Sequence, residues 1–175
     1  MIVPGFISPC QHSFISARAF PCRCAPGDNL ALHHALRAAP KGTVIVCDAG
    51  GRLDVGHFGE LMALDAKNRE LAGLIINGAV RDAAELDDVD FPVFCAGYAP
   101  AQSTKRRAGV VGSRIRLKGV RVTEGDYIVA DRDAVAVVPK DAWGGVLKQI
   151  AEVCAVEHKI RARLARGERL FDILF

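Results

Sequence analysis

An arginine and an aspartate stand side by side after an apolar stretch of the chain. Arg81 and Asp82 follow residues 73–76, which are typical of a short buried strand, and the pair Asn77-Gly78, which predicts a turn. Open α/β sheets usually bind ligands just beyond the carboxyl ends of such strands. A guanidinium can meet two oxygens at once, and a carboxylate can hold a divalent cation. The pair therefore predicts a site for a small keto acid.

A predicted helix precedes this strand and contributes a third part of the site. Leu61, Leu64 and Leu71 are spaced by three and by seven residues, so a helix would place them on one apolar face. The first backbone N–H groups of a helix lack partners within the helix and attract anions. We therefore expect the N–H groups of residues 59–62 to be able to hold a carboxylate.

Length, composition and charge exclude several classes of protein. The chain has 175 residues, of which 50% are hydrophobic and 25% charged, as expected for one globular domain. The net charge is only +3, and the basic run 105–107 has no aromatic residues within it, so we expect no nucleic-acid partner. No segment approaches the length of a membrane span, and residues 1–16 lack the features of a signal peptide. We therefore expect no membrane partner.

The six cysteines could indicate disulfides or a metal site. Disulfide scaffolds are usually shorter and denser in cysteine than this chain. Cys47 and Cys95 lie inside apolar runs, where cysteine behaves as a small hydrophobic residue. Cys22 and Cys24 have the wrong spacing for a zinc ribbon, and no second pair follows them. The sequence predicts reduced thiols in a cytoplasmic protein.

Strands and helices are predicted along the rest of the chain. We expect strands at 17–24, 43–47, 92–96, 127–130 and 134–138, an alternating hairpin from Ser113, and helices at 29–38, at 83–86 and from Asp141 to Leu164. Asp28 is a predicted N-cap. His33 and His34 point about 100° apart on a helix, so they cannot readily share a metal. The glycines after 43–47 lack the spacing of a dinucleotide loop, and the 98–112 loop is long enough to be functional.

The stretch GELMALDAKNRELAGLIINGAVRD, residues 59–82, resembles the signature of the RraA-like family. The resemblance continues through PKGTVIVCDAGG, VFCAGYAP and GVRVTEGDYIVADRDAVAVVP, and it covers about residues 19–168. The family includes metal-dependent 4-hydroxy-4-methyl-2-oxoglutarate aldolases and the regulators of ribonuclease activity A. In the regulators the aspartate of the Arg-Asp pair is replaced, whereas this chain has Asp82.

The resemblance implies a fold and an assembly. The fold is an α/β, three-layer β/β/α swivelling-domain fold with mixed sheets, formed as a single domain by residues 19–175 after an atypical N-terminal leader at 1–18. The assembly is a homotrimer or a dimer of trimers. The long apolar stripe of the C-terminal helix also favours an oligomer, because exposed stripes of this kind usually find a partner.

The chemistry expected at this site is a retro-aldol cleavage. Cleaving a 4-hydroxy-2-oxo acid leaves negative charge on the pyruvate half, which a lysine Schiff base or a divalent metal can stabilise. No lysine lies in an obviously apolar run, so we favour Mg²⁺ or Mn²⁺ held by Asp82. Arg81 is suited to bind the keto or carboxylate oxygens and to steady the enolate.

The resemblance assigns further roles around this pair. It places the pyruvyl carboxylate on the backbone N–H groups of Gly59, Glu60, Leu61 and Met62. Glu60 would order a metal-bound water, and Lys105 would meet the distal carboxylate. Glu157, on the C-terminal helix of a neighbouring subunit, is the candidate base.

We therefore expect a metal-dependent aldolase that releases pyruvate from a small oxo acid, with oxaloacetate decarboxylation as a side activity. One alternative is a non-catalytic regulator that binds a ribonuclease; Asp82 argues against it, since a regulator needs no metal ligand. Another is a binding module that has lost its activity, which the unusual N-terminus would suggest. A methyltransferase is not supported, because the sequence has no recognisable S-adenosylmethionine loop.

Overall fold

The computed structural model describes residues 1–11 and 13–175, whose contacts form two compact units, Met1–Lys140 and Asp141–Phe175. The strands, all in the first unit, are β1 (Ile2–Val3), β2 (Ile15–Arg23), β3 (Thr43–Asp48), β4 (Gly73–Val80), β5 (Val93–Tyr98), β6 (Val110–Val111), β7 (Ile115–Leu117), β8 (Val120–Val122), β9 (Tyr127–Ala130) and β10 (Val135–Val138). Three α-helices accompany them: α1 (Leu30–Ala38), α2 (Glu60–Asn68) and α3 (Ala83–Val89).

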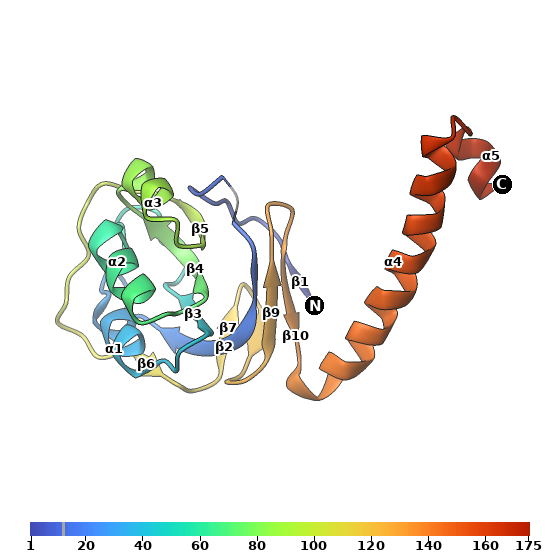
Figure 1. The fold of residues 1–175 in the computed structure, drawn as a ribbon. Helices are drawn as coiled ribbons and strands as arrows, with labels where there is room; N and C mark the ends of the chain where they lie inside the picture. Colours follow the sequence, from blue (N-terminus) through green and yellow to red (C-terminus); the bar gives the residue numbers. More distant parts are fainter. Residues whose placement is uncertain (12) are drawn as a thin grey trace. The chain divides into compact units, whose positions relative to one another are not determined.

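Eight strands form one mixed sheet in the order β1-β10-β9-β2-β3-β4-β5, with β6 as a further partner of β2 (Figure 1). The neighbours β2, β3, β4 and β5 are parallel, whereas β9, β10 and β1 pair antiparallel. Because parallel strands end at the same edge, the segments that follow β3, β4 and β5 meet there. The mixed α/β class predicted from the sequence is confirmed.

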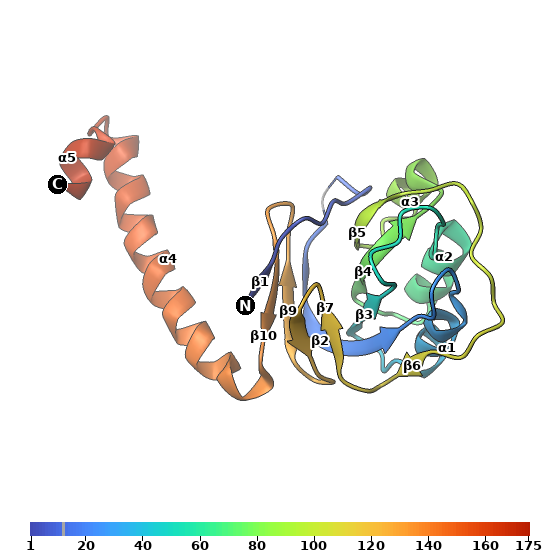
Figure 2. The same cartoon turned by 180° about the vertical axis from the view of Figure 1, so that it is seen from behind.

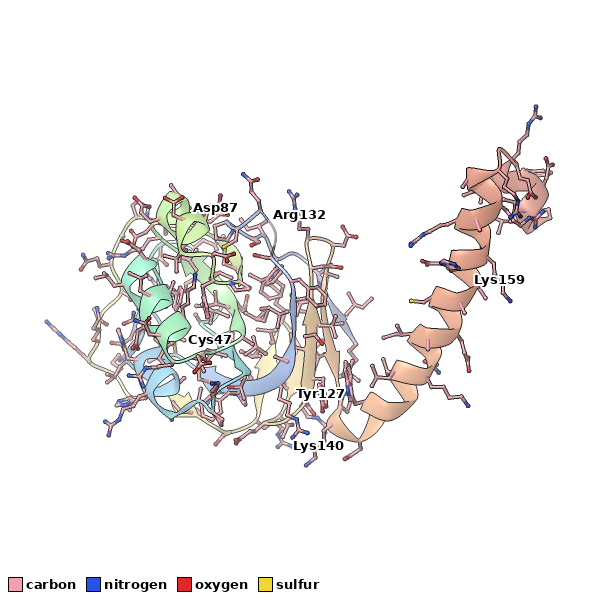
Figure 3. All side chains as sticks on the ribbon, viewed as in Figure 1. Cys47, Asp87, Tyr127, Arg132, Lys140 and Lys159 are labelled. Atoms are coloured by element: carbon pink, nitrogen blue, oxygen red, sulfur yellow. The ribbon has the colours of Figure 1, made fainter. Side chains whose placement is uncertain are left out.

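The large sheet has a different layer on each face. In β3, Ile45 and Cys47 face a core shared with α1, α2 and α3, while Val44 and Val46 face a core shared with β7 and β8. Helices α1, α2 and α3 gather on one side of the sheet in both views (Figure 1, Figure 2), and Cys47 lies in the interior (Figure 3). Helices, large sheet and hairpin thus make the three predicted layers.

The predicted alternation after Ser113 is confirmed by the hairpin β7–β8. Ile115, Leu117 and Val122 are buried on one face, and Val120 packs partly against them. All six cysteines are free thiols, and five of them are buried, as expected for small hydrophobic residues.

The predicted leucine stripe on α2 is wrong. Its buried residues are Ala63 and Ala66, whereas Leu61 is 72% exposed and Leu64 is 40% exposed. The helix ends at Asn68, so the buried Leu71 lies beyond it, in the connection to β4. Small alanine side chains let this short helix lie close to the sheet, and the apparent period combined a helix with the segment that follows it.

The predicted turn at Asn77-Gly78 is also wrong, because β4 continues to Val80 through a register shift between Ile76 and Ala79. A Cβ on Gly78 would lie 2.8 Å from the Cβ of Ala49, so this glycine permits a close contact with the segment that follows β3 rather than a turn. The strand therefore leads directly into Arg81.

The predicted domain boundary after residue 18 stays a prediction, but some residues before it belong to the large sheet. β1 pairs with β10, and β2 begins at Ile15, so residues 2–3 and 15–18 of the expected leader belong to the large sheet. The contacts divide the chain after Lys140. The second unit holds α4 (Trp143–Ala165) and α5 (Leu170–Leu174), in which no residue is buried. No helix among the described residues is long and apolar enough to span a membrane.

Candidate active site

Arg81 and Asp82 lie immediately beyond β4, as predicted. The Arg81 N–H donates to the carbonyl of Phe58 (2.9 Å), and its Nε lies 3.2 Å from Oδ2 of Asp82. Asp82 adopts a left-handed backbone conformation with φ of 57°. Such conformations are uncommon outside glycine and cluster at functional sites, although aspartate tolerates them better than most residues.

Two glycines let the loop before α2 approach this pair. The N–H of Gly56 donates to the carbonyl of Ala101 (2.8 Å), and a Cβ on Gly56 would lie 2.7 Å from the Ala99 oxygen and 2.9 Å from the Arg81 Cβ. A Cβ on Gly59 would overlap Oδ2 of Asp82. The backbone of Gly59 is extended, so glycine is needed there for space rather than for an unusual φ.

The start of α2 offers two free N–H groups rather than the four expected. Glu60 donates its N–H to Oδ2 of Asp82 (3.3 Å), and Met62 donates to the carbonyl of Gly59 (3.1 Å). The N–H groups of Gly59 and Leu61 meet no acceptor in the part of the chain that the structure describes. These two groups are the ones that remain available to a carboxylate.

A cavity of about 160 Å³ lies against this end of α2. Among the predicted site residues, five line it: Gly59, Leu61, Met62, Arg81 and Lys105. Asp82 and Glu60 are joined to them by the contacts given above. The fold thus brings together all the predicted residues of the first unit.

Five polar residues that the sequence analysis did not assign to the site also line the cavity: Asn29, His33, His57, Gln102 and Ser103. The side-chain amide of Asn29 donates to the His57 carbonyl (2.8 Å). Buried atoms without a hydrogen-bond partner in the described structure are Oδ1 of Asn29, Nε2 of His33 and both ring nitrogens of His57. Because unpaired buried polar atoms are costly, they mark places where a ligand can supply the missing partner.

The surroundings of both imidazoles favour the neutral form, because they lower the pKa of each ring. Burial lowers the pKa of His33, and the nearby charge of Lys105 lowers it further. Burial likewise lowers the pKa of His57. A neutral imidazole has one nitrogen that can accept a proton. The signal for His33 was its place on α1 four residues after the N-cap Asn29.

Asp28 fixes the loop that carries Lys105. Its buried carboxylate accepts the Leu30 N–H (2.9 Å) at the start of α1, the Thr104 hydroxyl (2.6 Å) and the N–H of Arg106 (2.7 Å). Burial raises the pKa of Asp28, but the hydrogen bonds outweigh burial and lower it to about 2. The predicted N-cap at Asp28 is wrong, because the N-cap of α1 is Asn29. Asp28 lies one residue earlier and holds residues 99–109, the loop between β5 and β6, which runs past α2 and α1 (Figure 1).

Glu157, the remaining predicted residue, lies on α4 in the second unit. Its Oε2 accepts a hydrogen bond from Nη2 of Arg161, one helical turn further on (3.0 Å). This pair is exposed, so it stabilises the helix only slightly. The role of Glu157 stays a prediction.

Asp82 is suited to hold a hard divalent cation. Its Oδ1 accepts no hydrogen bond from the described residues, and its side chain is 32% exposed. No group of three or more candidate ligands occurs among residues 1–11 and 13–175, so these residues offer no closed site of the structural zinc type. Mg²⁺ commonly uses one or two carboxylates together with water and substrate oxygens, which a single aspartate at a cavity can satisfy.

The sequence matches known proteins over most of its length. Residues 2–137 match the family described as RraA-like, Aldolase/RraA. A Halalkalibacterium halodurans protein named "Putative 4-hydroxy-4-methyl-2-oxoglutarate aldolase" is 38% identical over 125 residues, which are 71% of this chain and 60% of that protein. This chain thus spans less than two thirds of that relative's length.

Two solved structures share the fold of the chain. One, from Geobacillus kaustophilus, is named as an S-adenosylmethionine: 2-dimethylmenaquinone methyltransferase; it is 34% identical with a TM-score of 0.75, covering 81% of this chain and 87% of that one. The other is the RNA-processing inhibitor RraA from Thermus thermophilis, which is 28% identical with a TM-score of 0.75, covering 80% of this chain and 85% of that one. By the match of most of its sequence and by its fold, this chain belongs to the RraA-like family.

Proposed function

We propose that this chain is a divalent-cation-dependent lyase that cleaves 4-hydroxy-2-oxo acids, of the 4-hydroxy-4-methyl-2-oxoglutarate type, to pyruvate. The proposal rests on the place where the segment after the end of β4 contacts the start of α2. There an arginine and two free N–H groups belong to residues that line one small cavity, and a carboxylate contacts that arginine. These are the groups that a 2-oxo carboxylate requires: donors for its oxygens and a ligand for a cation beside them.

Substrate binding is assigned to the first turn of α2 and to Arg81. The free N–H groups of Gly59 and Leu61 bind the carboxylate next to the keto group, where the partial positive charge of the helix end favours an anion. Arg81 donates to the keto or carboxylate oxygens. A divalent cation held by Asp82, such as Mg²⁺ or Mn²⁺, would supply positive charge beside the keto oxygen.

Cleavage requires a base for the hydroxyl at C4, and His33 fits this role in the first unit. Its Nε2 is buried, has no partner in the described structure and belongs to the wall of the cavity. The imidazole takes the hydroxyl proton as the C3–C4 bond breaks, and the electrons of that bond move onto the pyruvate half. A proton then adds to C3 and gives pyruvate. Lys105 also lines the cavity, and we assign it to the distal carboxylate of the substrate.

Glu157 remains the candidate base from a second subunit. We propose a homotrimer, or a pair of trimers, in which α4 packs against another copy of the chain. The support is the apolar surface of α4, where Leu147, Ile150, Val153 and Val156 are 45–58% exposed. Exposed stripes of this length usually mark an interface.

The same site would decarboxylate oxaloacetate. Loss of CO₂ from C3 also leaves negative charge on a pyruvate unit, so the groups that stabilise one reaction stabilise the other. We expect this reaction as a side activity.

Release of pyruvate tests the proposal directly. We expect pyruvate from 4-hydroxy-4-methyl-2-oxoglutarate and from oxaloacetate when Mg²⁺ or Mn²⁺ is present, and its loss after EDTA treatment. Metal-independent release at the same rate would refute the role of the cation. No release from either acid, together with inhibition of a ribonuclease by the purified chain, would favour the non-catalytic regulator.

A further inference from the structure

A second cavity lies on the other face of the large sheet from the proposed active site. Its volume is about 380 Å³, and its lining residues are Arg23, Asp48, Arg114, Ile115, Arg116 and Arg121. Cys22, Cys24 and Cys47 pack toward the helices. Side chains alternate along a strand, so Arg23 and Asp48 point the other way, toward the hairpin β7–β8.

The charges that line this cavity are unbalanced. Four arginines accompany one aspartate, which leaves three positive charges in excess. Asp48 is already engaged, because its Oδ1 accepts the Gly50 N–H (3.1 Å) and the Asn77 side-chain amide (3.0 Å). None of the four guanidinium groups lies within 4.0 Å of a carboxylate in the described part of the chain.

The hairpin brings two of these arginines together. Arg116 and Arg121 are direct partners across β7 and β8, on the face opposite to the buried Ile115, Leu117 and Val122. Like charges placed directly opposite in an antiparallel pair are destabilising. The only hydrogen bond that the described structure gives to either side chain joins Nη1 of Arg116 to the Gly119 carbonyl (3.1 Å). A bound anion would remove this repulsion.

We propose that this cavity binds the phosphate group of a small molecule. Its arginines come from β2, from β7 and the segment before it, and from β8, so they reach one volume from several directions. A tetrahedral phosphate presents oxygens in several directions and can meet several guanidinium groups, whereas one carboxylate is planar and is matched by one fork. Concentrated positive charge in a cavity further favours an anion with more than one negative charge.

Calorimetric titration with inorganic pyrophosphate, in metal-free buffer of low ionic strength, tests this site. The test variant is Arg116→Gln with Arg121→Gln. The control variant is Arg37→Gln with Arg132→Gln, which removes the same charge from exposed positions outside the cavity; Arg132 lies at the tip of the β9–β10 hairpin (Figure 3). We expect the dissociation constant to rise at least tenfold, roughly the effect of losing a charged hydrogen bond, in the test variant and less than about twofold in the control.

Thermal denaturation gives a second readout that detects misfolding. At a pyrophosphate concentration ten times the wild-type dissociation constant, the Tm of the wild type and of the control should rise by about 3–6 °C, and that of the test variant by no more than about 1–2 °C. Without ligand the test variant should melt no lower than the wild type, since it loses a like-charge pair. Equal affinity of all three proteins for pyrophosphate would overturn the proposal.

Three further results would assign the arginines to another partner. Citrate bound as tightly as pyrophosphate would indicate a polycarboxylate. A short single-stranded RNA that displaces pyrophosphate at lower concentration would indicate a nucleic-acid contact. Dissociation of an oligomer in the test variant alone, measured by light scattering, would indicate an interface between copies of the chain. Each of these results would overturn the assignment to a small phosphorylated molecule.

Discussion

Asp82 carries the strongest prediction at the scale of single residues. Asparagine has nearly the same shape and also tolerates a left-handed backbone, so Asp82→Asn should preserve the fold while removing the charge that holds a cation. We expect pyruvate release to fall at least about a hundredfold, the scale of losing one preorganised electrostatic group. Steady-state kinetics in the presence of Mg²⁺ measures this. If Asp82→Asn keeps full activity in EDTA-treated buffer, the cation-dependent mechanism is refuted.

Arg81 is expected to act through its geometry and not only through its charge. Lysine keeps the positive charge but cannot present a planar fork to two oxygens, so Arg81→Lys should lower kcat/KM about tenfold or more. The backbone bond from the Arg81 N–H to Phe58 does not depend on the side chain, so the fold should persist. Kinetics within about twofold of the wild type would show that this position supplies only general positive potential.

The proposed role of His33 as the base predicts how kcat/KM depends on pH on the acidic side. Burial and Lys105 lower its pKa below the ordinary value of 6.5, so the neutral imidazole is lost only as the pH falls through that lowered value. If it is the base, kcat/KM should fall with the neutral form at low pH, and His33→Asn should be slow and lack this limb. His34→Asn, one residue further along α1 and exposed, is the matched control. An acidic limb that persists in His33→Asn would transfer the role to another group.

At the scale of elements, Asp28 joins α1 to the loop that carries Lys105. Its pKa is about 2 in the folded chain and 3.8 ordinarily, so ionised Asp28 contributes about 2 kcal/mol to the free energy of unfolding. A lowered pKa gives stability that is complete above about pH 4 and is lost as the pH falls toward 2. Asp28→Asn should therefore be less stable by about this amount at pH 7, and the difference should become small at pH 2 and vanish below it.

Urea denaturation at several pH values measures this contribution. Asp88→Asn, at an exposed position on α3, is the matched control and should change the free energy of unfolding by less than about 0.5 kcal/mol. A difference between Asp28→Asn and the wild type that is independent of pH would mean that the side chain stabilises by its shape and not by its charge.

The elements also show what sequence patterns could and could not predict. The hairpin β7–β8 was predicted because its alternation is local and one face is buried. The prediction of a leucine stripe on α2 is wrong because tertiary packing, and not local sequence, determines that Ala63 and Ala66 are the residues that face the sheet. The prediction of a turn at Asn77-Gly78 is wrong for the same reason. Gly78 makes room for Ala49 of a neighbouring segment, and no local pattern reveals this contact.

The residues of the candidate site also fall into two groups: those that local sequence predicts, and those that depend on tertiary contacts. Arg81 and Asp82 were predictable because they are adjacent in sequence and follow a recognisable strand. Asn29 and His57 meet only when α1 docks beside the loop before α2, through a side-chain bond to a carbonyl 28 residues away. The sequence shows neither that contact nor the buried nitrogens that it leaves without partners.

At the scale of the whole molecule, α4 is the part of the chain that most requires a partner. It runs for 23 residues without burying one, and large apolar side chains are exposed along it. In the proposed trimer this helix would both cover apolar surface and carry Glu157 to a neighbouring site. Light scattering should therefore give a mass of three or six chains, whereas a monomer would refute the assembly.

Mixing of inactive variants tests whether the sites are shared between subunits. Asp82→Asn and Glu157→Gln should each be inactive alone if both groups serve one reaction. After subunit exchange, some sites in mixed trimers would combine an intact Asp82 with an intact Glu157 from the neighbour, so activity should recover well above either parent. Glu152→Gln, at an exposed position on the same helix, is the control and should remain active alone. No recovery after confirmed exchange would place both groups in one chain's site, and full activity of Glu157→Gln would leave His33 as the base.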